Sequence, residues 1–229
     1  MKESLSVFFP VFNEEENIKS VVESALELLP SITKCYEIII VDDGSRDKTG
    51  QIADLLSRQY KEISVIHHFS NCGYGATLQT GFRAAKNDLI FFTDGDGQFN
   101  IKELSKLTVL IENADIVCGY RVKRADPLFR KINARLYRLL LRVLFNLKIT
   151  DINCAFKLFK QKVVQNLNFE SKSALINAEI LILAQKKGYA IKEVGVSHYP
   201  RVKGKQTGAK LPVILRTFAE LLRLWRKLK

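Results

Sequence analysis

The sequence predicts an α/β fold built on a largely parallel sheet, and three observations support this class. Short runs rich in β-branched and aromatic residues alternate with stretches of helical periodicity through the first half of the chain. The expected strands are residues 5–9, 37–41, 64–67, 88–93 and 115–119. Between them, apolar residues recur at helical spacing, as in residues 18–29. Three of the runs end in clusters of polar residues, as strands of such sheets do at a ligand site.

Longer helices are predicted in the second half of the chain. One should begin at Asp126, an N-cap followed by proline, and end near Leu147. Apolar residues form a stripe along this helix, and arginines occupy its other faces. A helix over residues 174–187 and a strand over residues 191–198 should follow, leading into a polar loop. Residues 211–229 predict an amphipathic basic helix, so we divide the chain into a domain over residues 1–210 and this C-terminal helix.

Composition narrows the class of protein. A chain of 229 residues with 47% hydrophobic and 26% charged residues is typical of a soluble globular fold. It has no run near the roughly 20 apolar residues of a membrane-spanning helix. No export leader is recognisable and the four cysteines show no pairing pattern, so we expect a cytoplasmic protein with reduced thiols. The net charge of +12, concentrated after Arg121, suits a nucleic acid, a phosphorylated substrate or an anionic membrane.

Acidic residues follow the expected strands 37–41 and 88–93. Because ligands bind beyond the carboxyl ends of strands in open α/β sheets, the clusters 42–45 and 94–97 should meet residues 13–14 in one crevice. Asp94 and Asp96 can direct oxygens at one Mg²⁺ or Mn²⁺ ion, with Gln98 in support. One such cluster alone is typical of a surface turn, but two at strand ends favour a site. The three histidines lack metal-ligand spacing and are assigned structural or surface roles.

With the neighbouring motifs, these clusters resemble glycosyltransferase family 2, in particular its dolichyl-phosphate mannosyltransferase and polyprenyl-phosphate glycosyltransferase branch. The resemblance extends from Ser4 to about Lys210, in the family's order and spacing. It rests on residues 10–14 (PVFNE), 41–49 (VDDGSRDKT), Asn71 with 73–76, and 94–98 (DGDGQ). The resemblance implies a GT-A fold, a single Rossmann-like sheet flanked by helices. It also implies inverting transfer of a sugar from a UDP- or GDP-linked donor, with Mg²⁺ or Mn²⁺ as cofactor.

The resemblance assigns the site position by position. The nucleotide sugar should be bound by residues at the strand ends and by two arginines. These residues are Pro10, Phe12, Glu14, Val41, Asp43, Asp94, Gly95, Arg121 and Arg201. The metal ligands should be Asp96 and Asp94, with Gln98 nearby. The residues expected to carry catalysis are Asp94, Asp96, Arg121, Asp151 and Glu179. The family usually has Tyr where this chain has Phe12, so the ring is kept and a hydroxyl is lost.

The resemblance also assigns the acceptor phosphate to Arg121, Arg135 and Arg201. For Arg135, a solvated helix face is an equally good interpretation. A phosphate acceptor already carries a nucleophilic oxygen near neutral pH, so Asp151 and Glu179 would orient groups and need not act as bases. A turn residue and a buried, ion-paired carboxylate are the alternatives for these two positions.

Two segments depart from the family's pattern. Residues 151–157 read DINCAFK where the family has Asp-x-x-Ser-Gly-Phe-Arg, and residues 204–207 read GKQT where it closes with Gly-x-Ser-Lys. Thr207 therefore replaces a lysine that often helps to bind diphosphate, and Lys203, Lys205 or Lys210 would have to substitute for it.

The predicted function is an inverting, metal-dependent glycosyltransferase with polyprenyl phosphate as acceptor. The alternative is a family-2 enzyme acting on a glycan or small-molecule hydroxyl, with Asp151 or Glu179 as base. A nucleic-acid partner is not expected, because no RNP, helix-turn-helix or zinc pattern accompanies the charge.

The C-terminal helix is expected to lie on an anionic membrane at its cytoplasmic face. The alternatives are packing on the protein's own core or on a second subunit of a homo-oligomer. Deletion from Leu211 onward is expected to spare donor hydrolysis, since no proposed donor contact lies beyond Arg201.

Overall fold

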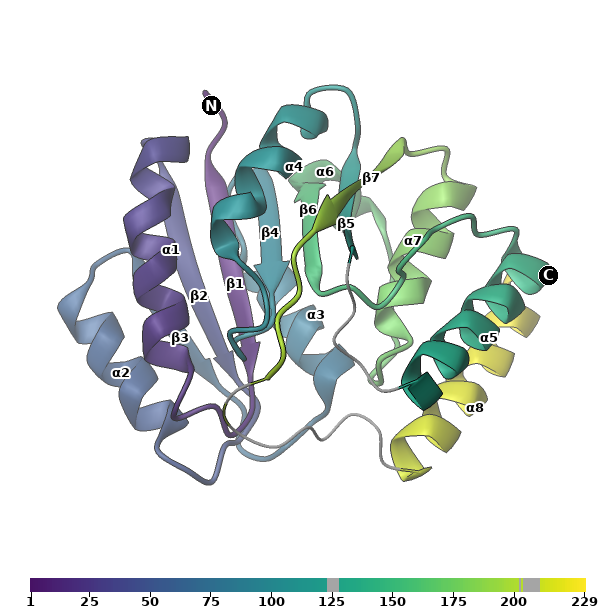
Figure 1. Cartoon of the computed structure of the whole chain (residues 1–229), viewed down its shortest axis with the longest axis horizontal. Coiled ribbons are helices and arrows are strands. Elements are labelled where there is room, and N and C mark those ends of the chain that lie inside the picture. Colours follow the sequence, from purple (N-terminus) through teal and green to yellow (C-terminus); the bar gives the residue numbers. More distant parts are fainter. Residues whose placement is uncertain (123–127, 202, 204–210) are drawn as a thin grey trace.

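The computed structural model describes residues 1–122, 128–201, 203 and 211–229, with the backbone alone for residues 128–131 and 211–215. Its described strands form one seven-stranded sheet in the order β3-β2-β1-β4-β6-β5-β7 (Figure 1). The strands are β1 Leu5–Val11, β2 Tyr36–Asp42, β3 Ile63–His67, β4 Leu89–Thr93, β5 Ile116–Arg121, β6 Phe156–Lys160 and β7 Ile191–Val196. Only β6 runs antiparallel to its neighbours within this sheet, so the predicted, largely parallel sheet is confirmed.

Helices cover both faces of the sheet, because successive strand residues point to opposite sides. On β1, Phe8 belongs to the core beneath α3 and α7, whereas Val7 and Phe9 belong to the core beneath α1, α2 and α4. The helices are α1 Ile18–Ile32, α2 Thr49–Gln59, α3 Tyr74–Ala84, α4 Leu104–Ile111, α5 Leu128–Phe145, α6 Gln161–Asn166, α7 Ile176–Lys186 and α8 Leu211–Leu228, with a short 3₁₀ turn at Ile101–Glu103. This three-layer arrangement leaves the carboxyl edge of the strands for a site.

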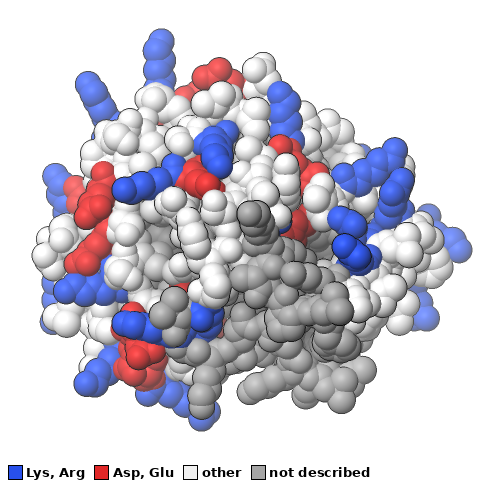
Figure 2. All heavy atoms as spheres, viewed as in Figure 1, with Lys and Arg blue, Asp and Glu red and all other residues white. Residues whose placement is uncertain are grey.

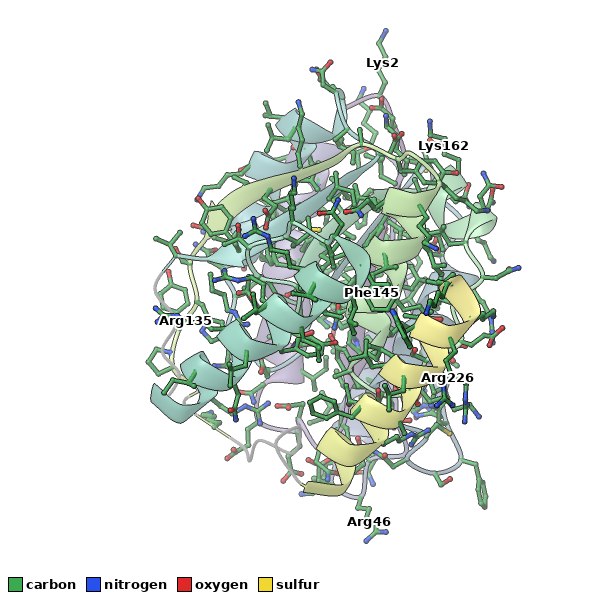
Figure 3. All side chains as sticks on the ribbon, turned by 90° about the vertical axis from the view of Figure 1, so that its right-hand side faces the viewer. Lys2, Arg46, Arg135, Phe145, Lys162 and Arg226 are labelled. Carbon is green, nitrogen blue, oxygen red and sulfur yellow. The ribbon has the colours of Figure 1, made fainter. Side chains whose placement is uncertain are left out.

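Helices α5 and α8 lie side by side on the outer flank of the molecule (Figures 1 and 3). The expected start of α5 at Asp126 lies outside the described residues, and α5 ends at Phe145, two residues before the predicted end. Part of the apolar stripe of α5 is exposed, with Leu136 and Val143 at 60% and 74% exposure, whereas Leu140 and Leu144 pack against the core. Amphipathic spacing predicts an apolar face but not what that face meets.

Helix α8 is attached to the core through Leu221 and Leu224, which are buried. Its apolar residues Phe218 and Leu222 remain exposed. Packing on the protein's own core therefore accounts for part of the helix, and the rest of its apolar face is at the surface. Among the described residues, no helix combines the length and apolar character that crossing a bilayer requires.

Candidate functional site

Loops after β1 and β2 are tied together at the carboxyl edge of the sheet. The parallel register places Val11 beside Asp42, so the chain leaves both strands at one point. The Asn13 side chain accepts from the Arg46 amide at 2.8 Å, and the Asn13 amide donates to Ser45 Oγ at 2.9 Å. Asn13 itself has a positive φ of 56°, a conformation that asparagine tolerates better than most residues. The motifs at 13–14 and 42–49 thus form one surface.

Arg201 joins two carboxylates at this edge. Its Nη2 donates to Glu14 Oε1 and lies 3.4 Å from Asp96 Oδ2. All three side chains are largely buried, with 9–13% exposure. Burial raises the pKa of Glu14, and hydrogen bonds from Asn17 and Arg201 oppose that rise. The guanidinium therefore neutralises a pair of acids that come from two different strand ends.

Asp94 and Asp96 form the acidic centre after β4. The Tyr74 hydroxyl donates to Asp94 Oδ1 at 3.1 Å. Burial, and then the neighbouring negative charge of Asp96, raise the pKa of Asp94 to about 7. Gln98 contributes its backbone amide to Asp96 Oδ1 at 3.0 Å, while its side chain donates to the Tyr199 carbonyl. Two oxygen ligands that resist joint ionisation fit a hard divalent cation, which would relieve their repulsion.

The raised pKa of Asp94 predicts that the metal-free protein loses stability as the pH rises. Between about pH 4 and pH 7 the folded state holds a proton that the unfolded state has released, so stability falls through this window by up to about 1.4 kcal/mol per pH unit. Thermal melts in chelator from about pH 5 to about pH 8 measure the slope. Asp94→Asn should remove it, and saturating Mg²⁺ should flatten it. Parallel profiles for wild type and Asp94→Asn would assign the slope to another group.

Arg121, at the end of β5, is held by Asp151 in a bidentate ion pair. Its Nε and Nη2 donate to the two carboxylate oxygens at 2.6 and 2.8 Å. The Arg121 amide also lies 3.3 Å from Asp151 Oδ2. Both side chains are about nine-tenths buried. Planar fork geometry fixes the orientation of the guanidinium, so Asp151 acts on the site through Arg121.

Lys157 on β6 is a site residue to which sequence reasoning gave no role. Its ammonium group donates to the carbonyls of Ile152 and Cys154 and to Asn177 Oδ1, and it lies 5.6 Å from the Phe92 ring centroid. The residue is 1% exposed. Its charge, with that of Arg121, opposes the rise in the pKa of Asp94. The one sequence signal was that the family has an arginine at this position.

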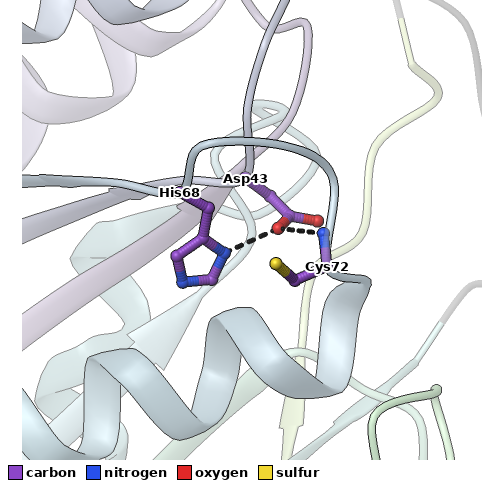
Figure 4. Close-up of side chains that lie close together, drawn as sticks. All are labelled: Asp43, His68 and Cys72. Carbon is purple, nitrogen blue, oxygen red and sulfur yellow. Dashed lines mark hydrogen bonds and ion pairs between the residues drawn. The ribbon is translucent and has the colours of Figure 1, made fainter.

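Asp43 accepts hydrogen bonds from the turn that starts α3 (Figure 4). Its Oδ1 accepts from His68 Nδ1 at 2.7 Å and from the Cys72 amide at 2.8 Å, and its Oδ2 accepts from the Gly73 amide at 2.9 Å. His67 is likewise within hydrogen-bond distance of Asp42 and Asp54, and the structural roles of both histidines stay a prediction. The ligand atoms of Asp43, His68 and Cys72 lie within 4.8 Å of one another, but these hydrogen bonds already account for the arrangement.

Several predicted donor contacts lie in or beneath this surface. Phe12 is half-buried at the edge, whereas Pro10 and Val41 pair in the β1–β2 register and are buried, Val41 completely. Gly95 is explained by packing, because a Cβ there would lie 2.5 Å from Val11 Cγ1. The contact of each with a nucleotide sugar stays a prediction.

Other predicted residues form no hydrogen bond or ion pair with Asp94 or Asp96 in the part of the chain that the structure describes. Arg135 is exposed on α5, as Figure 3 shows. Glu179 is buried on α7, where it accepts hydrogen bonds from the backbone amides of Glu170 and Ser171 and not from the arginine or lysine of the alternative interpretation. Lys203 is exposed, and residues 204–207 with Lys205 and Lys210 lie outside the described residues.

The sheet order and the acidic carboxyl edge fit the GT-A fold. Consistent with this fold, the model of the family "Glycosyl transferase family 2" matches residues 6–167. The chain therefore belongs to glycosyltransferase family 2.

Curated relatives confirm the resemblance to the polyprenyl-phosphate branch. The glycosyltransferase AglD of Haloferax volcanii is 29% identical over 98% of this chain, which spans 37% of that protein. The undecaprenyl-phosphate 4-deoxy-4-formamido-L-arabinose transferase of Pectobacterium carotovorum is 28% identical over 87% of this chain, which spans 64% of that protein.

Among solved structures, glucosyl-3-phosphoglycerate synthase of Mycobacterium tuberculosis, in complex with Mn²⁺, UDP and phosphoglyceric acid, has a TM-score of 0.75. It is 20% identical, and the alignment covers 97% of this chain and 78% of that one. This likeness confirms the fold.

Proposed function

We propose that this chain transfers a sugar, with inversion, from a UDP- or GDP-linked donor to a polyprenyl phosphate, using Mg²⁺ or Mn²⁺. The observation that carries the proposal is the acidic centre of Asp94 and Asp96, with Arg201 and the Arg121–Asp151 pair near it. The named relatives support the acceptor class. The neighbouring structure, solved with Mn²⁺ and UDP, supports a metal and a nucleotide donor.

The residues divide into a donor side and an acceptor side. A cation held by Asp94 and Asp96 would supply counter-charge for the departing diphosphate. On the donor side, the positive charge of Arg201 compensates the negative charges of Glu14 and Asp96, which would otherwise repel an anionic ligand. On the acceptor side, Arg121 in its fixed orientation would hold the acceptor phosphate.

A phosphate acceptor fits the ion pair of Asp151 with Arg121 better than a hydroxyl acceptor does. Both oxygens of Asp151 accept from Arg121, so the carboxylate is already engaged and would have to leave this pair to take a proton from a hydroxyl. A phosphate oxygen needs no base, so the step requires only alignment and charge stabilisation. The alternative with a hydroxyl acceptor would require this ion pair to open.

The proposal is tested with the purified full chain, Mn²⁺ or Mg²⁺, and a panel of UDP- and GDP-sugars with and without polyprenyl phosphate. We expect release of nucleoside diphosphate that depends on the lipid, and a product that extracts into organic solvent with inverted anomeric configuration. Transfer to a glycan or small-molecule hydroxyl without the lipid would replace this function with the alternative. Absence of transfer from every donor would reject both.

A lipid acceptor also requires a route to the membrane, and the flank formed by α5 and α8 supports one. Exposed apolar side chains lie on both helices, namely Ile132, Leu136, Leu139, Val143, Phe218 and Leu222. Arginines 135, 138, 142, 216, 223 and 226 lie on the same two helices. Exposed apolar side chains on helices that also carry arginines suit an anionic bilayer surface. On the face in Figure 2, basic and acidic side chains are mixed on the left, whereas the described atoms at the right are mainly basic.

Replacing two residues of this flank should weaken binding to anionic vesicles. The double variant Leu136→Gln with Leu139→Gln is expected to lose about 2 kcal/mol of partitioning, roughly 30-fold, in a vesicle sedimentation assay. Val109→Gln on α4, also at an exposed apolar position of 69%, is the matched control and should bind as wild type does. Unchanged binding would contradict the membrane surface. If light scattering shows that the double variant loses an oligomeric state, the flank is a homo-oligomer interface.

The division of the chain into a domain over residues 1–210 and a C-terminal helix stays a prediction.

A further inference from the structure

The segment before α7 has four consecutive backbone amides, residues 170–173, held by two glutamates from different helices. Glu179 on α7 accepts the amides of Glu170 and Ser171, at 3.1 and 2.8 Å. Glu220 on α8 accepts the Lys172 amide at 3.4 Å and the Ser173 amide at 3.2 Å, and the Ser173 hydroxyl donates to it at 2.6 Å. The Glu220 side chain is 16% exposed, so little water competes for these bonds.

The other side of the segment packs tightly against the first turn of α3. The Lys172 carbonyl accepts from the Gly75 amide at 3.1 Å, and the Ser171 carbonyl accepts from Gln79 Nε2 at 3.1 Å. A Cβ atom at Gly75 would lie 2.4 Å from the Ser171 oxygen and 2.6 Å from the Ser173 oxygen. Backbone meets backbone here without space for a methyl group, so the segment and the start of α3 are in direct contact.

The start of α3 in turn contacts both acidic clusters of the site. Tyr74 donates its hydroxyl to Asp94, and the Gly73 amide donates to Asp43. A continuous series of contacts therefore runs from α8 to the residues proposed to meet the donor. Glu220 is the member of that series on α8, and it lies outside the site.

We propose that Glu220 is a positioning residue for the donor site: by holding residues 172–173 it sets Tyr74 against Asp94. The inference rests on the proposed function only for the role of Asp94 toward the donor. It reverses the expectation that deletion from Leu211 would spare donor hydrolysis. Such a deletion removes Glu220 and also takes the buried Leu221 and Leu224 from the core.

The test uses the full chain with Glu220→Gln, which keeps the size of the side chain but removes its charge. We expect donor turnover to fall about tenfold, since charge-assisted hydrogen bonds to two amides and a hydroxyl are weakened. The matched control is Glu170→Gln. This variant breaks the exposed ion pair between Glu170 and Lys227, which also joins the segment before α7 to α8 but through side chains alone. It should leave turnover unchanged.

A double-mutant cycle separates positioning from general loss of structure. If Glu220 acts through Tyr74, then Glu220→Gln combined with Tyr74→Phe should be no slower than Tyr74→Phe alone. Rate losses that multiply, or a Glu220→Gln variant as fast as wild type, would overturn the inference. Should Glu220→Gln fold poorly by thermal melting, Ser173→Ala removes one bond to the same carboxylate and is expected to show the same non-additivity with Tyr74→Phe.

Hydrogen exchange provides a readout that does not depend on the reaction. Glu220→Gln should speed exchange at the amides of residues 172–173 and at the Gly75 amide, while the amides of β1 stay protected. Unchanged exchange at Gly75 would overturn the inference even in an active enzyme. If the wild-type chain turns over no donor, the proposed function fails, and the exchange result still decides whether α8 positions α3.

Discussion

Asp96→Asn is expected to lower sugar transfer about 1,000-fold while the fold is retained. The variant keeps the shape of the side chain and one oxygen that can accept the Gln98 amide. It removes one of the two carboxylates proposed to hold the cation, so the departing diphosphate would be less neutralised. A loss of about 4 kcal/mol of transition-state stabilisation corresponds to this factor. Initial rates at saturating Mn²⁺ measure it, and Mn²⁺ titration of the variant should show weaker binding.

Asp54→Asn is the control for that experiment. Asp54 lies on α2, is 48% exposed, and shares only His67 with the network near the site. Its substitution should leave both turnover and Mn²⁺ affinity unchanged. Equal turnover of Asp96→Asn and wild type at saturating metal would remove the metal site from the proposal, which would then rest on the fold and the family match.

Lys157→Met is expected to cost about 3 kcal/mol of folding stability and to lower activity as well. The ammonium group satisfies two carbonyls and the Asn177 side chain in a place that water does not reach. Methionine has similar length but leaves these oxygens without a donor. The melting temperature should fall by roughly 6–12 °C in a chain of this size. Activity should fall because the loop 151–154, which carries Asp151 and so orients Arg121, loses its anchor.

Lys160→Met on the same strand tests whether any lysine of β6 would have this effect. Lys160 is 30% exposed and lies 3.6 Å from Asp115, and a partly exposed pair of this kind contributes little to stability. We expect a change within about 0.5 kcal/mol. A Lys157→Met variant as stable as Lys160→Met would show that the buried ammonium group is not a structural anchor.

The elements that the sequence predicts well are those whose pattern is local. The run before Asp94 is apolar and β-rich, and β4 covers Leu89–Thr93. The expected helix over residues 174–187 is α7, Ile176–Lys186. Strand β6 was not among the expected strands, because its sequence FKLFK places a lysine at a buried position. That burial depends on oxygen acceptors from a loop and from α7, which no local pattern contains.

Charge and amphipathic spacing likewise indicate which residues are polar or apolar, but not which residues they contact. The spacing along α5 indicates an apolar face, yet four residues of that face are exposed because the helix lies outermost beside α8. Glu179 was noticed as an acid in an apolar helix, but only the fold shows that backbone amides surround it. Glu220 had no distinguishing signal at all, since an acid on an amphipathic helix is ordinary.

The sequence by itself determined the α/β class, the acidic strand ends and the family, because periodicity, turn chemistry and motif spacing are set by neighbours along the chain. Only the tertiary structure decided which charges meet. Arg201 reaches Glu14 across 187 residues and Asp96 across 105, and Glu220 reaches Ser173 across 47. Such pairs form where strand order and helix packing bring distant segments together. Contacts throughout the core stabilise that arrangement, so no short stretch of sequence determines it.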